Sequence, residues 1–197
     1  MEKGDEEMKI LDIGCGNDKY REEGSIVFGI DKYKTDCVDK LWDGEKDKIP
    51  YPDNYFDKVV SFGALEHISN FKNVMEEIWR IVKPNGKVII QVPNFNSLVA
   101  FSEEHKVFFT IDSFSYMEEG HYGNWIYDIR FKIIKNDYVF ISNRKSKLRF
   151  LNLLNPVINF KPIKFVYTEM SKMMSMLIIP TFLRFELVKV VPNGKGG

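Results

Sequence analysis

The sequence has few cysteines, no excess of either charge and no long hydrophobic run. Cys15 and Cys37 are the two cysteines, too few for a disulfide framework, and this favours the cytoplasm as the compartment. Lysine plus arginine and aspartate plus glutamate both number 28, so overall charge gives no attraction for nucleic acid. The longest apolar stretch, Met173 to Leu183, is too short to span a bilayer and contains a proline.

The remaining composition is that of an ordinary globular protein. Hydrophobic residues make up 44% and charged residues 28% of the 197 positions. A chain of this length can bury a sizeable core, so we expect residues 1–197 to form a single domain. The opening segment, Met1 to Glu7, is charged and does not read as a signal peptide.

A glycine-containing turn follows the first apolar run. Residues 10–16 read Ile-Leu-Asp-Ile-Gly-Cys-Gly, and Asp31 ends the next apolar run. The two glycines let backbone approach a ligand closely, and a carboxylate after the second strand can bind a ribose diol, so the pattern predicts a nucleoside site. Lys19 stands where a dinucleotide fingerprint has its third glycine, which argues against a nicotinamide cofactor.

Short apolar runs alternate with helical patterns along the first half of the chain. The runs predict strands of a parallel sheet buried on both faces, at residues 9–13, 26–30, 37–41, 57–62 and 87–92. Apolar residues from Phe71 to Val82 recur at helical spacing, with Ser69 or Asn70 as N-cap. For residues 17–24 we expect one or two helical turns. The alternation favours a doubly wound α/β sheet with right-handed crossovers.

The pattern changes after residue 92. Residues 127–133 and 138–142 alternate around Asn136-Asp137, which predicts an antiparallel hairpin. Residues 184–190 alternate again and predict an antiparallel last strand. Between these segments, residues 146–182 are apolar, lysine-bearing and methionine-rich, and we expect them to be helical and irregular.

Four motifs in the first half resemble the class I S-adenosylmethionine-dependent methyltransferases. Asp12-x-Gly14-x-Gly16 resembles the first motif of that family, and residues 56–61 with 64–68 look like its fourth strand and the loop beyond. Residues 79–87 look like the turn before its fifth strand. The resemblance implies S-adenosylmethionine as cofactor and a Rossmann-like, mostly parallel sheet with an antiparallel last strand. It divides the chain into a cofactor-binding half, 9–95, and an acceptor-side half, 96–197, with a helical and hairpin insertion at 143–182.

The resemblance places the cofactor at the carboxyl ends of the strands, where ligands of open α/β sheets bind. Asp31 is expected to accept both ribose hydroxyls, whereas Asp43 or Trp42 is expected at the adenine. Asp12 either orients the cofactor's ammonium group or accepts amides of the turn. The expected backbone contacts of the methionine part come from Gly14, Cys15, Gly16, Phe62 and Gly63.

Methyl transfer to a hydroxyl benefits from a base, and the sequence has three histidines. His105 follows the fifth predicted strand, where the acceptor should lie, and is our candidate base. His67, next to the fourth strand, is the candidate supporting residue, and His121 is a weaker option. Each histidine also has an ordinary structural interpretation. We assign no metal-binding residues from the sequence.

A second resemblance concerns the acceptor. Residues 92–97, 105–110 and 113–114 resemble a subgroup of small class I methyltransferases often associated with polysaccharide synthesis. Tyr167-Thr168-Glu169, Pro180 and Phe185-Glu186-Leu187 match that subgroup's late pattern. The resemblance implies a small hydroxyl-bearing acceptor, such as a sugar or glycan intermediate. The methionine-rich residues 170–179 suggest a packing helix, or else a surface for a lipid-linked acceptor or peripheral membrane contact.

Two other functions use the same cofactor half. A nucleic-acid methyltransferase needs a basic stripe, and Arg144, Lys145, Lys147 and Arg149 form the dense basic cluster of the sequence. A non-catalytic S-adenosylmethionine-binding protein needs only the pocket. The neutral overall charge argues against the first of these.

Overall fold

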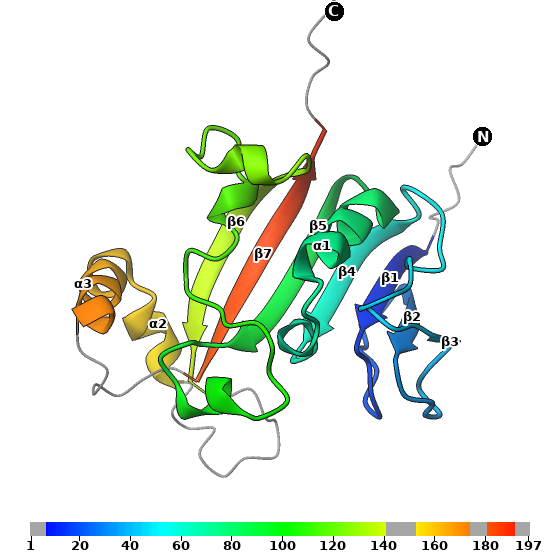
Figure 1. Ribbon diagram of the computed structural model, residues 1–197, viewed down its shortest axis with the longest axis horizontal. Helices are drawn as coiled ribbons and strands as arrows, with labels where there is room; N and C mark the ends of the chain where they lie inside the picture. The colour runs from blue at the N-terminus through cyan, green and yellow to red at the C-terminus, as the bar shows by residue number, and fades with distance from the viewer. Residues whose placement is uncertain (1–6, 141–152, 174–180, 192–197) are drawn as a thin grey trace, which may run out of the picture.

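The computed structural model describes residues 7–140, 153–173 and 181–191, and side chains to residue 168 within the second range. Its centre is a seven-stranded sheet in the order β3-β2-β1-β4-β5-β7-β6 (Figure 1). The strands are β1 Met8–Ile13, β2 Ser25–Asp31, β3 Lys40–Leu41, β4 Phe56–Phe62, β5 Val82–Pro93, β6 Arg130–Val139 and β7 Phe182–Val190.

The sheet has one antiparallel strand, β7, which lies between β5 and β6. The chain moves outward from β1 in one direction to β2 and β3, and in the other to β4 and β5. The order reverses between β1 and β4, and such a switch point is where open α/β sheets bind ligands. The predicted doubly wound sheet and its antiparallel last strand are therefore confirmed.

The helix α1, Phe71–Ile81, connects β4 to β5 and lies across the sheet (Figure 1). Its inward residues Val74, Met75, Ile78 and Ile81 are fully buried, as the helical spacing predicts. Asn70 is the N-cap residue, but its side chain makes no capping hydrogen bond. Two further helices, α2 Asn155–Ile158 and α3 Lys161–Met173, lie beyond the β6 edge.

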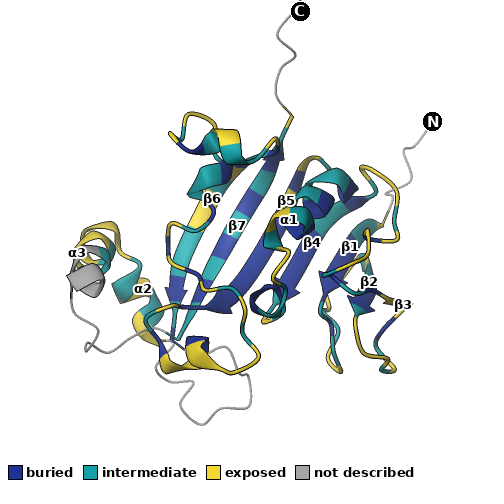
Figure 2. Ribbon diagram, viewed as in Figure 1, coloured by how far each residue is buried: buried dark blue, intermediate teal, exposed yellow. Residues whose placement is uncertain are grey.

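The two faces of the sheet carry cores of different size. Alternate strand residues such as Leu11, Val59 and Ile90 belong to the main core, under α1. Their neighbours Ile10, Val60 and Ile89 form a small separate cluster. Figure 2 shows the buried strands running through the centre of the molecule. The rings of Phe109 and Phe114 extend the main core toward the acceptor-side half.

The small cluster is covered by a loop and not by a crossover helix. Residues 17–24 contain turns and bends, so the helical turns expected there are wrong. The Asp12 carboxylate accepts the Tyr20 amide at 2.7 Å, and Lys58 binds Glu22 at 2.5 Å. These bonds hold the loop directly against β1 and β4, where a helix would need more chain. The ring of Tyr20 packs on Phe62 at 5.8 Å.

The predicted hairpin around Asn136-Asp137 is also wrong. Both residues continue β6 and lie in register with Phe185 and Arg184 of β7. A bulge between Ile133 and Lys135 shifts the alternation, so one irregular strand resembles two strands and a turn. Lys164 from α3 binds the carbonyl and side-chain oxygens of Asn136, which satisfies polar groups that a turn would expose.

Several expectations fall outside the described residues: the basic cluster at 144–149, the end of the predicted hairpin at 141–142, and the methionine-rich residues 174–179. Cys15 and Cys37 are both free thiols, in agreement with the absence of a disulfide framework. In the described part of the chain, every helix is too short or too polar to cross a membrane.

Candidate functional site

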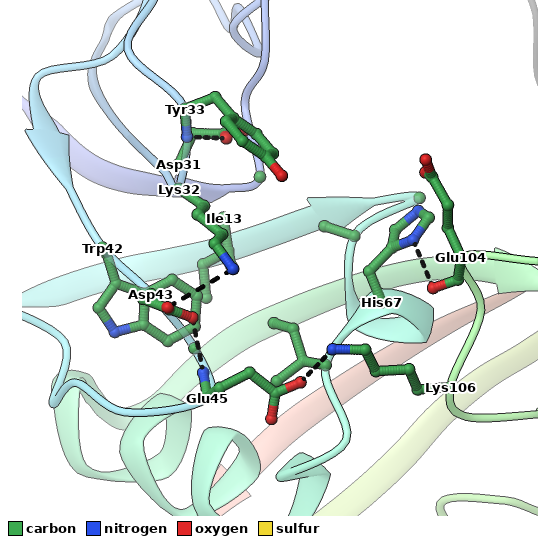
Figure 3. Close-up of a pocket in the computed structure, with 15 residues that line it drawn as sticks. Ile13, Asp31, Lys32, Tyr33, Trp42, Asp43, Glu45, His67, Glu104 and Lys106 are labelled. Carbon is green, nitrogen blue, oxygen red and sulfur yellow. Dashed lines mark hydrogen bonds and ion pairs between the residues drawn. The ribbon is translucent and has the colours of Figure 1, made fainter.

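A cleft of about 640 Å³ opens at the carboxyl ends of β1, β2 and β4, beside the switch point of the sheet (Figure 3). This size lies within the usual range of small-molecule sites. The loops after these strands converge on the cleft because parallel strands end at one edge of the sheet. The lining residues are Ile13, Gly14, Asp31, Lys32, Tyr33, Trp42, Asp43, Gly44, Glu45, Gly63, Ala64, His67, Ile68, Glu104 and Lys106.

The turn after β1 brings backbone to the floor of the cleft. Gly14 has φ +74°, and a Cβ built on it would lie 2.2 Å from the Cβ of Ala64. Glycine is therefore required at this position by backbone conformation and by space. Gly16 also has positive φ, but it is not among the lining residues. Cys15 points back into the sheet: its thiol contacts the Cys37 carbonyl oxygen at 3.7 Å, and burial raises its pKa to about 12.

Asp31 at the end of β2 faces the cleft and also organises the loops around it. Its Oδ2 accepts the Gly16 amide and its Oδ1 accepts the Tyr33 amide, both at 2.9 Å. Each carboxylate oxygen can accept more than one hydrogen bond, so both retain capacity for a ligand's hydroxyl groups. The predicted acid is thus placed in the cleft and held in one orientation by two backbone amides.

Asp43 and Trp42 line the neighbouring part of the cleft. Asp43 accepts the Glu45 amide at 3.1 Å and pairs with Lys32 and Lys46 at 3.6 and 3.8 Å. The Glu45 amide and these two cations lower the pKa of Asp43. Trp42 is almost fully buried, and its Nε1 donates to the Asp47 carbonyl. Both sequence candidates for the adenine position are therefore in the cleft.

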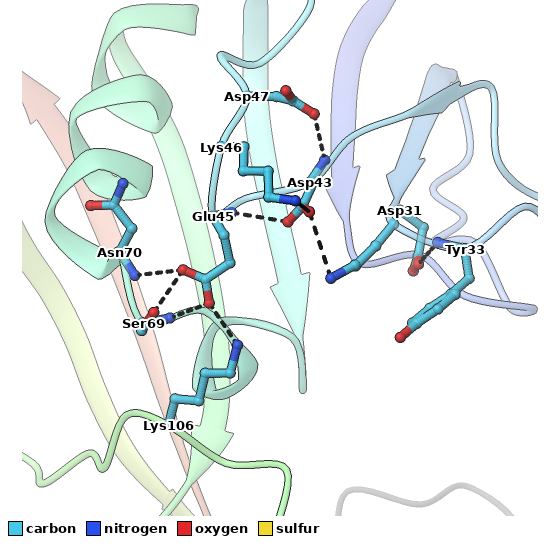
Figure 4. Close-up of polar contacts among 10 residues, drawn as sticks. Asp31, Tyr33, Asp43, Glu45, Lys46, Asp47, Ser69, Asn70 and Lys106 are labelled. Atoms are coloured by element: carbon cyan, nitrogen blue, oxygen red, sulfur yellow. Dashed lines mark hydrogen bonds and ion pairs between the residues drawn. The ribbon is translucent and has the colours of Figure 1, made fainter.

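Glu45 connects three segments at the cleft wall (Figure 4). It accepts the Ser69 amide at 2.8 Å, the Asn70 amide at 3.2 Å and the Lys106 ammonium at 2.8 Å. The lysine and the Ser69 bonds lower its pKa to about 2. This carboxylate meets the amides at the start of α1, where the predicted N-cap side chains make no capping bond. Through Lys106, it also connects the segment after β5 to the cofactor-binding half.

Two residues predicted to touch the cofactor lie behind the cleft. Asp12 is 3% exposed, accepts the Tyr20 amide and is absent from the lining. Burial raises its pKa to about 6. Of its two predicted roles, the contact with a turn amide is the one seen. The ring of Phe62 packs on Tyr20 outside the cleft, whereas the next residue, Gly63, lines it with φ +73°.

His67 and His105 meet at the end of the cleft near the acceptor-side half. Their ring centroids are 4.8 Å apart, edge to face. His67 lines the cleft, as Figure 3 shows, whereas His105 is half-buried and is not a lining residue. The structure thus brings both candidate histidines together at one end of the cleft. His121 lies elsewhere, between the rings of Tyr116 and Tyr122.

Glu66 completes this end of the site and was missed in the sequence. Its side chain is 3% exposed, and burial raises its pKa to about 7. The lining of the cleft itself includes five charged or aromatic residues that sequence reasoning missed: Lys32, Tyr33, Glu45, Glu104 and Lys106. Lys32 and Tyr33 directly follow the end of β2, a signal that could have identified them. Glu104 and Lys106 carry no comparable signal, because their loop reaches the cleft only through tertiary packing.

Comparisons with known proteins agree with this geometry. Residues 11–90 match the model of a family described as a methyltransferase domain. A malonyl-[acyl-carrier protein] O-methyltransferase of Buchnera aphidicola is 28% identical over 182 residues, which are 85% of this chain and 71% of the relative. A demethylmenaquinone methyltransferase of Bacillus mycoides is 28% identical over 122 residues, and the match spans about half (51%) of each protein.

The fold has a close counterpart among solved structures. The crystal structure of a SAM dependent methyltransferase from Archaeoglobus fulgidus superposes with a TM-score of 0.60. The match covers 92% of this chain and 86% of the other, at 17% sequence identity. At this sequence identity the likeness shows the fold alone. The match of residues 11–90 to the methyltransferase family is separate evidence, and it comes from the sequence.

Proposed function

We propose that the chain is a class I S-adenosylmethionine-dependent methyltransferase that methylates a hydroxyl group of a small acceptor, a sugar or glycan intermediate. S-Adenosylmethionine carries a methyl group on a positively charged sulfur; the acceptor oxygen would attack the methyl carbon in line, so that the oxygen–methyl bond forms as the sulfur–methyl bond breaks and S-adenosylhomocysteine and the hydroxyl proton are released. Positioning of the two reactants can provide much of the rate of such a displacement.

The residues of the cleft fit the cofactor. The volume of about 640 Å³ suits a nucleoside with an amino-acid side arm. Gly14 and Gly63 leave backbone exposed on the β1 and β4 side of the cleft, where a side chain on Gly14 would collide with Ala64. We propose that Asp31 holds the ribose, that Trp42 and Asp43 lie at the adenine, and that Gly14 and Gly63 face the methionine part.

The acceptor is proposed to bind beside His67, at the end of the cleft nearest the acceptor-side half. This assignment rests on one observation: an imidazole lines the cleft there with a second imidazole against it. We propose that the two histidines assist the loss of the hydroxyl proton, because oxygen becomes a better nucleophile as the proton leaves. The Buchnera relative is an O-methyltransferase, which supports an oxygen acceptor.

An exposed aromatic cluster supports an acceptor with an apolar or sugar-ring surface. Phe95, Phe101 and Phe108 lie 5.7–5.9 Å from one another and are 41%, 60% and 46% exposed. Contiguous exposed apolar surface of this kind is a feature of ligand-binding and interaction sites. Their segment is anchored to the site because the Lys106 and Val107 amides donate to the Glu66 carbonyl oxygen. A lipid-linked sugar would place its sugar beside His67 in the cleft and its lipid on the aromatic cluster.

The test is a methyl-transfer assay with radiolabelled S-adenosylmethionine and a panel of acceptors. The panel contains nucleotide sugars, lipid-linked sugars, malonyl-acyl-carrier protein, demethylmenaquinone and RNA. We expect labelled ether product from a sugar, reduced at least tenfold by His67→Gln and unchanged by His121→Gln. Label transferred only to quinone, acyl carrier protein or RNA would overturn the sugar proposal, and binding of the cofactor without any turnover would favour a non-catalytic protein.

A further inference from the structure

Glu66, His67 and His105 form a compact group of potential metal ligands, which we call the Glu66 cluster. Each residue places one ligand atom within 4.8 Å of the other two. Glu66 and His67 belong to the short 3-10 helix Leu65–His67 after β4, and His105 comes from the segment after β5. The group lies at the acceptor end of the cleft, because His67 is a lining residue.

Hydrogen bonds from Nδ1 orient both imidazoles and select the tautomer of the neutral ring. His67 Nδ1 lies 3.2 Å from the Glu104 carbonyl oxygen, and His105 Nδ1 lies 3.1 Å from the Ala100 carbonyl oxygen. A carbonyl oxygen can only accept, so each Nδ1 is the donor, and in the neutral imidazole the lone pair is then on Nε2. Histidines that ligate metals are typically oriented by this kind of bond from the other ring nitrogen.

The carboxylate of Glu66 lacks the partners that burial normally demands. Its Oε2 is buried, and within the described residues no hydrogen-bond partner reaches it. Buried charged oxygens are usually paired or bound to a metal, because leaving water without compensation is costly. The ammonium group of Lys106 does not satisfy it, since that group is paired with Glu45 at 2.8 Å.

From these contacts we propose that the Glu66 cluster binds one divalent transition-metal ion, through a Glu66 carboxylate oxygen and Nε2 of His67 and His105. Metal bonds of about 2.1 Å place two ligand atoms at most roughly 4.2 Å apart, so ligand atoms 4.8 Å apart must approach each other by at least about 0.6 Å on binding. Two imidazoles with one carboxylate favour zinc, iron, cobalt or nickel over magnesium and calcium, which prefer oxygen ligands. Both histidines are only partly buried and His67 lines the cleft, so a ligand can reach the ion from that side.

The two histidines would then hold the ion that activates the acceptor hydroxyl. This part of the inference rests on the proposed function. A hydroxyl bound to a divalent cation loses its proton more readily, because the cation stabilises the oxygen anion. The acceptor hydroxyl would occupy an open position of the ion, release its proton to solvent and form the oxygen–methyl bond as the sulfur–methyl bond breaks. The site thereby selects an oxygen acceptor and holds it next to the methyl group.

The test measures metal binding without any acceptor. The full chain, stripped with a chelator, is titrated with zinc chloride by calorimetry and with cobalt chloride by absorption spectroscopy. We expect one site per chain with a Kd in the micromolar range or below. Glu66→Gln and His105→Gln should each weaken zinc binding at least a hundredfold, and thermal melting checks that both variants fold.

Two control variants separate this site from other metal-binding groups. Cys37→Ser and His121→Gln remove a thiol and an imidazole outside the cluster, and should bind zinc with wild-type affinity. Equal zinc affinity of wild type and folded Glu66→Gln, or loss of binding in Cys37→Ser, would overturn the proposal. S-Adenosylhomocysteine is titrated in parallel: wild-type protein that binds zinc but not this product refutes the proposed function alone, and the converse refutes the metal site alone.

Discussion

The substitution Asp31→Asn tests the proposed ribose contact most directly. It replaces one carboxylate oxygen with an NH₂ group of almost the same size. In the wild type both oxygens accept backbone amides at 2.9 Å, from Gly16 and from Tyr33. The new NH₂ group must therefore face one of these N–H donors, and it can no longer accept a ribose hydroxyl.

The expected loss of affinity follows from the hydrogen bonds removed. A hydrogen bond to a charged group contributes about 1.5–3 kcal/mol. Loss of one such bond to the ribose corresponds to a rise of about 10- to 150-fold in the Kd for S-adenosylhomocysteine. The donor facing another donor also destabilises the loop, so we expect a lower melting temperature as well.

Calorimetric titration with S-adenosylhomocysteine, far below the melting temperature, measures the effect on affinity. Asp39→Asn is the matched control: Asp39 accepts the Gly29 amide at 2.6 Å in the adjacent loop but does not line the cleft. This variant should lose stability and keep a Kd within about threefold of wild type, since no charged hydrogen bond to the ligand is removed. If Asp31→Asn binds as tightly as Asp39→Asn, the ribose assignment is wrong.

Three further substitutions probe the floor of the cleft and its supports. Gly14→Ala forces its new Cβ against Ala64 at 2.2 Å with φ at +74°, so calorimetry should show S-adenosylhomocysteine affinity reduced more than tenfold; wild-type binding would contradict the close packing. Burial raises the pKa of Asp12 to about 6, so the folded protein binds a proton here more tightly than the unfolded chain does. The resulting gain in the free energy of unfolding is fully present below about pH 4 and is lost as the pH rises through 6. Asp12→Asn should abolish this pH-dependent fall of about 3 kcal/mol in the free energy of unfolding, measured with urea at several pH values. If the variant keeps the wild-type pH dependence, Asp12 is not the group responsible. Phe114→Ala empties a fully buried site 4.5 Å from the ring of Phe185 and should cost about 3–5 kcal/mol of unfolding free energy, whereas a loss below 1 kcal/mol would contradict the packing.

Local patterns in the sequence were sufficient to predict the strands, the turn and the acidic residue that form the cofactor side of the cleft. The turn at Gly14 and the acid at Asp31 are close in sequence to the strands that position them. Strand ends, glycine positions and the 3.6-residue period of α1 are all properties of short segments. The β7 alternation likewise predicted a strand, because one face packs on the core along its whole length.

Contacts between distant segments were beyond the reach of those patterns. The Asn136-Asp137 pair was interpreted as a turn because the bulge in β6 shifts the alternation, and only pairing with β7 shows one continuous strand. Glu45 serves the start of α1 and Lys106 at once, across 61 residues in the second case. No local pattern reports a carboxylate that caps a helix from a different loop.

The acceptor end of the cleft depends on tertiary structure most strongly. The sequence by itself determined that two histidines and a glutamate follow β4 and β5, and therefore lie near one edge of the sheet. The packing of the 104–108 segment against Glu66 decided that His105 meets the ring of His67, which lines the cleft. Strand order fixes the edge at which a side chain emerges, whereas its orientation depends on packing between segments far apart in the chain.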